Sequence, residues 1–360
     1  MTSAVLSRRS LLLAPLAPPT EFRFIALGQA LIEHDLRAQH YPGWSPLRES
    51  LAWGQVVFSN LESPIRGGEE RADPDVLKHS APLDVLDCLR DCHVNLLSLA
   101  NNHAFDFGPL GVERTIEAAG KRGFGVAGTG RDVTQASSPG YFGAKPTRVA
   151  LLAFASKMNS TGGIAGESTP GANHLGMSAP GRLDPRDMER ILKAIAAAAA
   201  EADYVVVYHH DHYWEKDNSR TAPWKIEWAH RSIDAGASIF ISHGAPLLQG
   251  IEIYRGRPIF YDLGNFVFQT RKAVGDYPAS AWQSVIARCT FRDRQVASID
   301  LLPLVLNERG DPGDQFFDTR GRPSLASASE SEAILKGLAT MSHPFATSIK
   351  IANARGSIEM

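Results

Sequence analysis

The order of structural patterns along the chain constrains its fold more than any single motif. From Phe22 onward, short apolar or β-branched runs alternate with segments whose apolar residues recur at helical spacing. Strands that alternate with helices build layered α/β folds. The clearest helix is expected between Asp184 and Ala202, because Asp184 can cap it, Pro185 suits its first turn and an alanine run propagates it. The chain is therefore predicted to be an α/β protein.

The expected elements fit one large domain with a short segment at each end. We interpret residues 1–21 as a leader, residues 22–305 as the domain, and residues 306–360, where the patterns weaken, as a C-terminal extension. Strands are expected at 22–28, 55–59, 95–100, 204–208 and 238–241, with a hairpin at 251–261. Helices are expected at 82–92, 111–122, 184–202 and 226–235, and a long loop at 159–180.

The composition excludes several classes of protein. Hydrophobic residues make up 44% and charged residues 21% of the chain, which is typical of a globular protein with a sizeable core. The formal charge of −2 provides no overall positive field, so no nucleic-acid partner is expected. No run approaches the roughly 18 apolar residues of a transmembrane helix. The 3 cysteines lack CxxC spacing and predict neither a disulfide framework nor a thiolate zinc site.

The N-terminus resembles an export signal of the twin-arginine type. Arg8 and Arg9 precede an apolar stretch that begins at Leu11. Prolines interrupt that stretch, and almost no spacer separates it from the strand expected at residue 22. We therefore favour a cytoplasmic location, with export as the alternative.

Polar residues follow five of the expected strands, at the edge where open α/β sheets bind ligands. Convergence of imidazole, amide and carboxylate groups from separate strands predicts one shared polar site. The residues at these strand ends are Gln29, Asn60, Glu62, Asn101, Asn102, His103, His209, His210, Asp211, His212, Ser242 and His243.

A divalent metal would account for these residue types, because neutral imidazole, carboxylate and amide oxygen suit Mn, Fe or Zn. A bound metal ion can also deprotonate water near neutral pH. Alternate residues of a strand share a face, so His210 and His212 are expected to point together while His209 and Asp211 point away. Alternatively, Asp211 accepts a hydrogen bond that orients a ligand histidine.

Three stretches of the sequence resemble one known family. They are VVFSNLESPI, NLLSLANNHAFDFGPLGVERTIEAAGKRGFGVAGTG and DAGASIFISHGAPLLQGIEIYRGRPIFYDLGNFVF, and together they span roughly residues 22–268. The family is that of the bacterial capsule-synthesis proteins of the poly-γ-glutamate CapA type, which carry a calcineurin-like metallophosphatase fold. The resemblance implies a four-layer α/β/β/α sandwich. The ANNHAFDFG and YDLGNF segments are its most specific parts.

The resemblance also implies roles for individual residues. Metal ligation is implied for Asn60, Glu62, Asn102, His210 and His243, with His212 as an added donor, for one or two ions or none. A role as proton donor or charge stabiliser is implied for His103, and Asp106 and Asn265 resemble positions that support the ligands or face the substrate. Independently of the resemblance, His243, Asp35 and Asp106 are catalytic candidates, and Gln29, Asn265 and Trp214 are candidates for the substrate side.

Two departures from the family pattern weaken the expected metal site. The family usually has Gly-Asp after the first strand, and this chain has Gly28-Gln29, so a neutral amide replaces a carboxylate. Where the family has a GHHPH segment, this chain has SHGAP, which ends in Pro246 and lacks the closing histidine. Both changes remove strong ligands and should weaken at least one of two metal positions.

The sequence leaves three functions open. The favoured one is a metal-dependent hydrolase that cleaves a phosphoester, or an amide of the peptide or polyglutamate type, with His103 as the proton donor. The second is a metal-poor acid/base enzyme such as a peptide epimerase, which needs a residue on each face of the Cα centre, for example His243 with Asp35 or Glu62. The third is a non-catalytic accessory subunit in capsule polyglutamate synthesis. The partner is accordingly a small molecule, a peptide or polyglutamate, and the oligomeric state stays undefined.

Aromatic residues crowd the segment after the histidine cluster. They form either the wall of a substrate pocket or ordinary helix packing. The residues concerned are Tyr208, Tyr213, Trp214, Trp224 and Trp228.

Overall fold

The computed structural model describes residues 21–38, 40–67, 78–143, 147–310 and 316–360. The predicted leader lies outside the described residues except for Glu21, which begins the first strand. Within the described ranges, no helix combines the length and apolar character needed to cross a bilayer.

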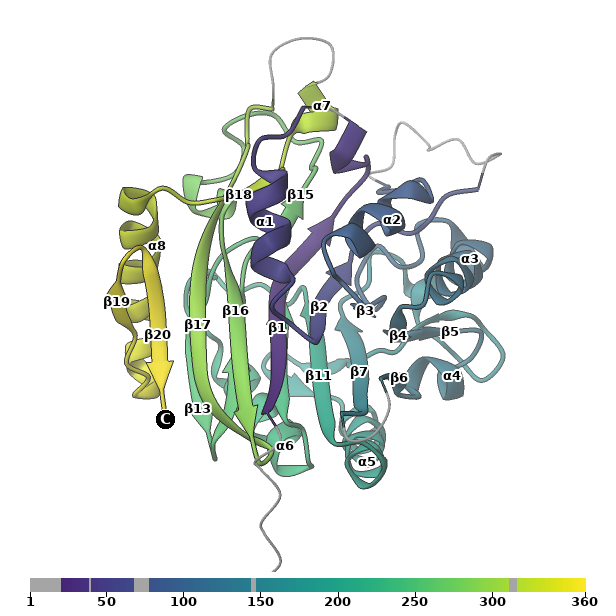
Figure 1. Ribbon diagram of the computed structural model, residues 1–360. Coiled ribbons are helices and arrows are strands. Elements are labelled where there is room, and N and C mark those ends of the chain that lie inside the picture. Colours follow the sequence, from purple (N-terminus) through teal and green to yellow (C-terminus); the bar gives the residue numbers. More distant parts are fainter. Residues whose placement is uncertain (1–20, 39, 68–77, 144–146, 311–315) are drawn as a thin grey trace, which may run out of the picture.

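Two large mixed sheets form the centre of the molecule (Figure 1). The larger sheet has the strand order β19-β20-β17-β16-β1-β2-β3-β4, with β15 also paired to β1 and β18 to β17. Its β1, β2, β3 and β4 are parallel, whereas β16 and β17 are antiparallel. The strands are β1 (Glu21–Leu31), β2 (Val56–Leu61), β3 (Leu96–Ser98), β4 (Gly125–Ala127), β15 (Asn265–Phe268), β16 (Gln283–Arg292), β17 (Gln295–Leu306), β18 (Pro323–Leu325), β19 (Lys350–Ala352) and β20 (Arg355–Glu359).

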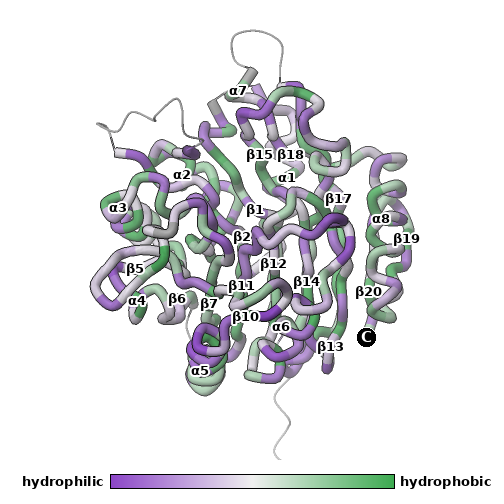
Figure 2. Tube along the Cα trace, turned by 180° about the vertical axis from the view of Figure 1, so that it is seen from behind, coloured by the Kyte–Doolittle hydropathy of each residue, from purple (hydrophilic) through white to green (hydrophobic). Residues whose placement is uncertain are grey.

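The smaller sheet has the order β13-β14-β12-β11-β7-β6, and β7, β11, β12 and β14 are parallel. Figure 2 shows the molecule from behind, with hydrophobic and hydrophilic residues interspersed along the chain. The strands are β6 (Gly140–Phe142), β7 (Val149–Ser156), β11 (Tyr204–Asp211), β12 (Ile239–His243), β13 (Ile251–Tyr254) and β14 (Arg257–Phe260). Two short pairs lie outside both sheets: β5 (Thr129–Gly130) with β8 (Gly171–Ala172), and β9 (Met177–Ala179) with β10 (Arg182–Leu183).

Helices cover the outer face of each sheet. Those packed on the larger sheet are α1 (Trp44–Leu51), α2 (Asp84–Asp91) and α3 (Gly108–Lys121), whereas α5 (Pro185–Glu201) and α6 (Pro223–Asp234) pack on the smaller one. The remaining helices are α4 (Val133–Ser137), α7 (Phe316–Thr319) and α8 (Ala328–Ser342), with short turns η1 (Leu36–Ala38), η2 (Thr161–Gly163), η3 (Ala279–Trp282) and η4 (His343–Phe345).

Alternation along the strands produces three apolar layers. In β1, Phe22 and Phe24 face the second sheet, whereas Ile25 and Leu27 face the helices. The same alternation in β11 sends Val206 to the central core and Val207 to the layer beneath α5 and α6. Helix, sheet, sheet and helix therefore stack in that order, which confirms the predicted four-layer α/β/β/α sandwich.

Most expected elements are present, and several strands are longer than expected. β1 continues to Leu31 and β11 to Asp211, so Gln29 lies within β1 and residues 209–211 lie within β11, whereas His212 follows it. The hairpin forms as expected, with φ of 51° and 71° at Arg255 and Gly256, which suits its two-residue turn.

The C-terminal segment is continuous with the sheets. The expected boundary after residue 305 falls inside β17, and β18 and β20 both pair with that strand. The strands β15 to β17 have no counterpart among the elements expected from the sequence. Ile334, Leu335 and Leu338 of α8 belong to the core between the two sheets, so α8 closes one open edge of the sandwich (Figure 1).

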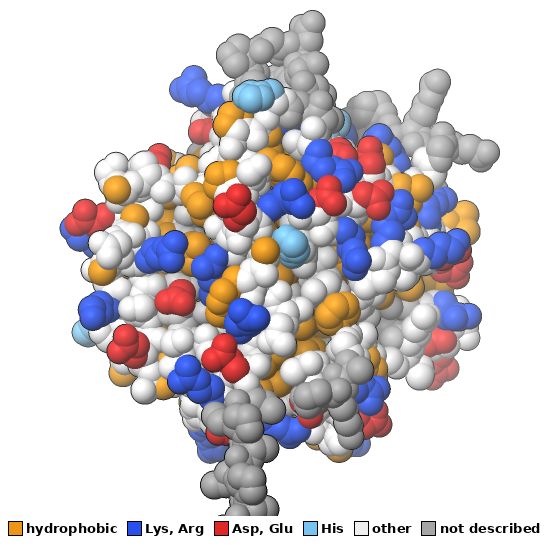
Figure 3. Space-filling view, viewed as in Figure 1, with side chains coloured by type: hydrophobic (Ala, Val, Ile, Leu, Met, Phe, Trp, Pro, Cys, Tyr) orange, Lys and Arg blue, Asp and Glu red, His pale blue; other side chains and the backbone are white. Residues whose placement is uncertain are grey.

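Charges of both signs intermingle on the surface. On the face shown in Figure 3, acidic and basic side chains alternate, and neither sign covers a continuous area. This distribution matches the small formal charge of −2.

The start of α5 combines a helix cap with a charged anchor. Asp184 caps the helix as expected, because its side chain accepts hydrogen bonds from the backbone N–H groups of Arg186 and Asp187. One turn further on, Asp187 accepts a hydrogen bond from the backbone N–H of Gly176 and pairs with Arg190 at 2.7 Å. The first turn of α5 is thereby tied to the segment between β8 and β9.

We expect Asp187→Asn to destabilise the protein by up to about 2 kcal/mol at neutral pH. Burial opposes ionisation, but hydrogen bonds from His174, Arg190 and the backbone of Gly176 lower the pKa of Asp187 to about 2. Because the folded pKa lies below the unfolded one, this contribution is present above pH ~4 and falls by about half by pH ~3. Urea denaturation of both proteins across this range provides the test. A difference that stays constant with pH would contradict the account.

Candidate metal centre

The carboxyl ends of β1, β2 and β11 meet around one cavity of about 700 Å³. The close approach of β1 to the segment before β15 depends on Gly28, where a Cβ atom would lie 2.4 Å from the carbonyl oxygen of Gly264. Residues of the loops after β11, β12 and β15 complete the wall. The lining residues are Gln29, Leu31, Glu62, His79, Asn102, His103, Asn159, His212, Trp214, Gly244, Pro246, Phe268, Thr270, Lys272, Asp276 and Tyr277.

Three metal-ligating side chains come together beside this cavity. One donor atom each from Glu62, His210 and His212 lies within 4.8 Å of the other two. His210, in β11, and His212, just after it, point the same way, as the sequence predicts, and their rings stack with centroids 4.8 Å apart. His210 Nε2 lies 3.7 Å from a Glu62 oxygen and 2.8 Å from Asn102 Oδ1. Four predicted ligands therefore converge.

The electrostatic state of these groups suits a cation. Burial raises the pKa of Glu62 to about 7; the positive charge of His103 opposes this shift and the negative charge of Asp106 adds to it. Burial lowers the pKa of His212 to about 4 and that of His210 well below its usual value. The two histidines are therefore neutral at pH 7, which is the form that binds metal ions.

Further observations support the fit of one ion. His212 Nε2 is buried without a hydrogen-bond partner, although its ring lines the cavity. Asn102 Nδ2 donates to Asn159 Oδ1 at 3.1 Å, which leaves Asn102 Oδ1 directed at His210. Ligand bonds of about 2.0–2.2 Å can span this donor set after small side-chain movements. The residues present thus fit one divalent ion held by imidazole, carboxylate and amide donors.

The remaining predicted ligands have other contacts. Asn60 Oδ1 accepts a hydrogen bond from Asn101 at 3.3 Å, and its amide nitrogen is buried without a partner. His243 is fully buried, with Nδ1 3.4 Å from the hydroxyl of Tyr208, and burial lowers its pKa to about 3. Neither residue belongs to the three-residue group, and no second such group occurs among the described residues.

A carboxylate holds the imidazole of His103 at the cavity wall. Its Nδ1 lies 2.8 Å from Asp106 Oδ2, so the carboxylate fixes the ring and its tautomer. The ring lines the cavity, and Nε2 is the nitrogen left free of the carboxylate. Asp106 therefore positions His103.

A second carboxylate–imidazole pair lies beside the first and was not expected from the sequence. His79 Nδ1 lies 2.6 Å from Glu33 Oε1, and Arg271 binds the other oxygen of Glu33 at 3.0 Å. The rings of His79 and His103 meet edge to face with centroids 4.4 Å apart. Because residue 79 follows no strand, the strand-end pattern could not identify it.

Two sequence-based roles need correction. Asp35 was a catalytic candidate, but its carboxylate is bound by the Arg37 guanidinium at 2.6 Å and does not line the cavity. Asp211 was an alternative acceptor for a ligand histidine, but it pairs with Lys225 at 2.9 Å and accepts from the backbone N–H of Tyr213. Each carboxylate therefore pairs with a basic side chain, Arg37 or Lys225, and not with the proposed metal ligands.

Gln29 and Asn265, two candidates for the substrate side, are linked to each other. The amide of Gln29 donates to Asn265 Oδ1 at 3.0 Å, and Gln29 Oε1 is buried without a partner. Gln29 lines the cavity, whereas Asn265 is fully buried behind it. Asn265 therefore acts on the cavity only through Gln29.

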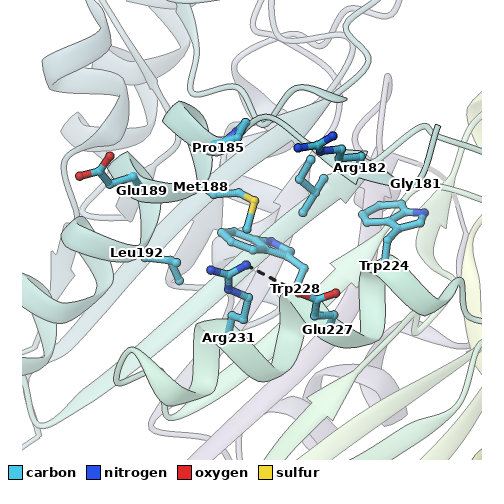
Figure 4. Close-up of a pocket in the computed structure, with 11 residues that line it drawn as sticks. Gly181, Arg182, Pro185, Met188, Glu189, Leu192, Trp224, Glu227, Trp228 and Arg231 are labelled. Atoms are coloured by element: carbon cyan, nitrogen blue, oxygen red, sulfur yellow. Dashed lines mark ion pairs between the residues drawn. The ribbon is translucent and has the colours of Figure 1, made fainter. Parts of the chain in front are cut away.

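The aromatic residues after the histidine cluster separate into two groups. Trp214 lines the metal-side cavity, is half exposed, and packs against His212 with ring centroids 5.3 Å apart. Trp224 and Trp228 instead line a separate pocket of about 430 Å³ between α5 and α6 (Figure 4). That pocket contains none of the predicted site residues, so only Trp214 is retained as a candidate for substrate contact.

Comparison with known proteins identifies relatives along most of the chain. The capsule biosynthesis protein CapA of Bacillus anthracis is 30% identical, and the match covers 71% of this chain and 59% of that protein. The uncharacterized protein y4sH of Sinorhizobium fredii is 26% identical over 94% of this chain and 93% of its own length. Among solved structures, the NAD nucleotidase of Haemophilus influenzae has a TM-score of 0.42 at 12% identity, covering 90% of this chain and 57% of that one.

The family comparison agrees with the segments noted in the sequence. The model of the bacterial capsule synthesis protein PGA_cap matches residues 23–270, which include β1, the NLE and ANNH segments, β11 and β15. The departures at Gln29 and Pro246 both lie within the matched range. The chain is therefore a divergent member of the bacterial capsule synthesis PGA_cap family.

Proposed function

We propose that this chain is a metal-dependent hydrolase, which cleaves a phosphoester or an amide of the peptide or polyglutamate type. The observation that supports it is the convergence of Glu62, His210 and His212 beside a cavity that also contains the His103–Asp106 pair. Mn, Fe or Zn suits these donors. When bound, such an ion would supply a Lewis acid that lowers the pKa of a coordinated water.

The protein's own groups would bind the substrate and move the proton. His103 Nε2 gives a proton to the departing group, and Asp106 stabilises the imidazolium and holds the ring. Lys272 lines the cavity and provides a positive charge for an anionic substrate. Trp214 and Tyr277 give the substrate an aromatic surface.

The hydrolase proposal is tested by His103→Gln. The wild type is first assayed with Mn²⁺ on p-nitrophenyl phosphate and on γ-glutamyl-p-nitroanilide. On the compound that it cleaves, we expect His103→Gln to lower kcat by about 10²- to 10⁴-fold, because proton transfer to the leaving group is lost. Mn²⁺ affinity should stay within about threefold of the wild type. His343→Gln, which changes an exposed histidine at η4, is the matched control. Failure of the wild type to cleave either compound with Mn²⁺, Zn²⁺ or Fe²⁺ would contradict the proposal.

An accessory role in capsule synthesis is the second candidate. The similarity to a capsule biosynthesis protein of Bacillus anthracis supports it. In that case the same cavity would hold a polyglutamate segment without cleaving it. Retention of polyglutamate by the wild type at low salt, with no release of shorter chains over many hours, would favour this role over hydrolysis.

A further inference from the structure

Two carboxylate–imidazole pairs, from different parts of the chain, face one cavity. In the first, Asp106 Oδ2 binds His103 Nδ1 at 2.8 Å; in the second, Glu33 Oε1 binds His79 Nδ1 at 2.6 Å. Both imidazoles line the cavity. The second pair is well buried, since the side chains of Glu33 and His79 are each 5% exposed.

Arg271 holds the carboxylate of the second pair in place. Arg271 binds the outer oxygen of Glu33 through Nε at 3.1 Å and Nη2 at 3.0 Å. Burial raises the pKa of Glu33, but the hydrogen bonds and charges of His79 and Arg271 outweigh it and leave this pKa below the usual value. The ionised carboxylate therefore holds Nδ1 of His79, and Nε2 is the nitrogen available to a substrate.

Asp106 joins the two pairs. Its Oδ2 also accepts a hydrogen bond from the backbone N–H of His79 at 2.9 Å, and the rings of His79 and His103 are in edge-to-face contact. The two imidazoles are thus held next to each other on one side of the cavity. Glu33 and Arg271 together fix the tautomer of His79 at the cavity wall.

This placement discriminates between reaction types. Phosphoryl transfer has its attacking and leaving oxygens roughly in line, on opposite sides of phosphorus, so an acid and a base must approach from opposite sides. In acyl transfer the attacking oxygen and the leaving nitrogen are both attached to one tetrahedral carbon. A single imidazole can therefore take the proton from the first and give one to the second. Two neighbouring imidazoles therefore suit an acyl centre.

We propose that His79 is a second catalytic residue of this site and that the pair of imidazoles hydrolyses an amide in preference to a phosphoester. This inference rests on the proposed hydrolase function. Water oxygen bonds to the carbonyl carbon while its proton passes to His79 Nε2. The C–N bond then breaks, and the proton on His103 Nε2 passes to the leaving nitrogen. The products are a carboxylic acid and an amine, and exchange with solvent restores both imidazoles.

The roles of the two histidines can be separated with two leaving groups. γ-Glutamyl-p-nitroanilide requires protonation of its nitrogen, whereas the corresponding p-nitrophenyl ester releases a phenolate that does not. With Mn²⁺ present, His79→Gln is expected to lower kcat about 100-fold or more on both compounds. His103→Gln should lower kcat on the anilide and largely spare the ester. p-Nitrophenyl phosphate should be the poorest substrate of the wild type.

A pH profile distinguishes a catalytic role from a structural one. His79 is faced by Glu33 from the segment after β1, by Arg271 through Glu33, by His103, and by Asp106 at its backbone N–H. His79→Gln should abolish the limb of kcat/KM that rises with pH, whereas His343→Gln should keep it. Glu33→Gln leaves the imidazole in place and should lower kcat with little change in KM, so it provides the test if His79→Gln folds poorly.

The outcomes separate this inference from the function on which it rests. A wild type that binds Mn²⁺ and cleaves the anilide, with His79→Gln equal to it in rate and pH profile, would overturn only the role of His79. Faster cleavage of the phosphate than of the anilide would overturn the amide preference. A wild type inactive on all three compounds would overturn the hydrolase function itself.

Discussion

Glu62→Gln is expected to weaken Mn²⁺ binding by about 100-fold or more, because it removes the carboxylate of the three-residue donor group. Glu62 offers the negative charge that a divalent ion needs, and His210 and His212 are neutral donors. Titration calorimetry in metal-free buffer measures the affinity, and Glu227→Gln at an exposed position is the matched control.

The same substitution should leave the metal-free protein at least as stable as the wild type. Burial disfavours the charged form of Glu62, so an uncharged amide of nearly the same shape relieves that cost. Thermal unfolding without metal therefore serves as the folding control. Unchanged Mn²⁺ affinity in a well-folded Glu62→Gln protein would contradict the assignment of this residue as a ligand.

Lys225→Met is expected to lower the free energy of unfolding by about 3–5 kcal/mol, because it leaves a buried carboxylate unpaired. Lys225 Nζ lies 2.9 Å from Asp211 Oδ2, and the two side chains are only 7% and 3% exposed. Asp211 stands between His210 and His212 at the end of β11. The pair thus holds the strand end that carries two of the proposed ligands.

Urea denaturation of a double-substituted protein separates the ion pair from other effects of the change. Lys225→Met combined with Asp211→Asn removes both charges, and we expect it to recover part of the stability lost in Lys225→Met. Arg231→Met, which removes an exposed cation from the same helix, should cost less than about 0.5 kcal/mol. A loss below about 1 kcal/mol for Lys225→Met would contradict a buried, structurally required pair.

Local patterns predict much of the fold because the strands and helices carry their own periodicity. Phe22, Phe24, Ile25 and Leu27 alternate in the sequence and separate into two core layers in the structure. Segments of mixed polarity beyond residue 306 carry no such pattern. β18 and β20 both pair with β17, and β20 also with β19; such pairing is tertiary information that a sequence window lacks.

The candidate site was predictable where its residues follow the strand pattern. His210 and His212 point the same way at the end of β11 by simple alternation, and Glu62 and Asn102 follow parallel strands of one sheet. Asp35 has the same apparent position after β1, but a single neighbouring arginine decides where its carboxylate lies. Which cation binds a given carboxylate depends on side-chain packing, and the sequence pattern does not specify that packing.

The second carboxylate–imidazole pair, Glu33 and His79, was not predictable from the sequence, because its members come from segments without periodic patterns. His79 lies in the connection before α2, and Arg271 lies in the loop after β15. They meet only through Glu33, which the end of β1 places between them. Contacts among three loops depend on the closed tertiary structure.

The central claim is that one divalent ion binds where β2 and β11 meet. Anomalous diffraction from crystals soaked in Mn²⁺, measured at the manganese absorption edge, tests it directly. The account predicts one strong peak in contact with Glu62, His210 and His212. Absence of a peak there, or a peak beside Gln29, Asn60 and His243 instead, would contradict it.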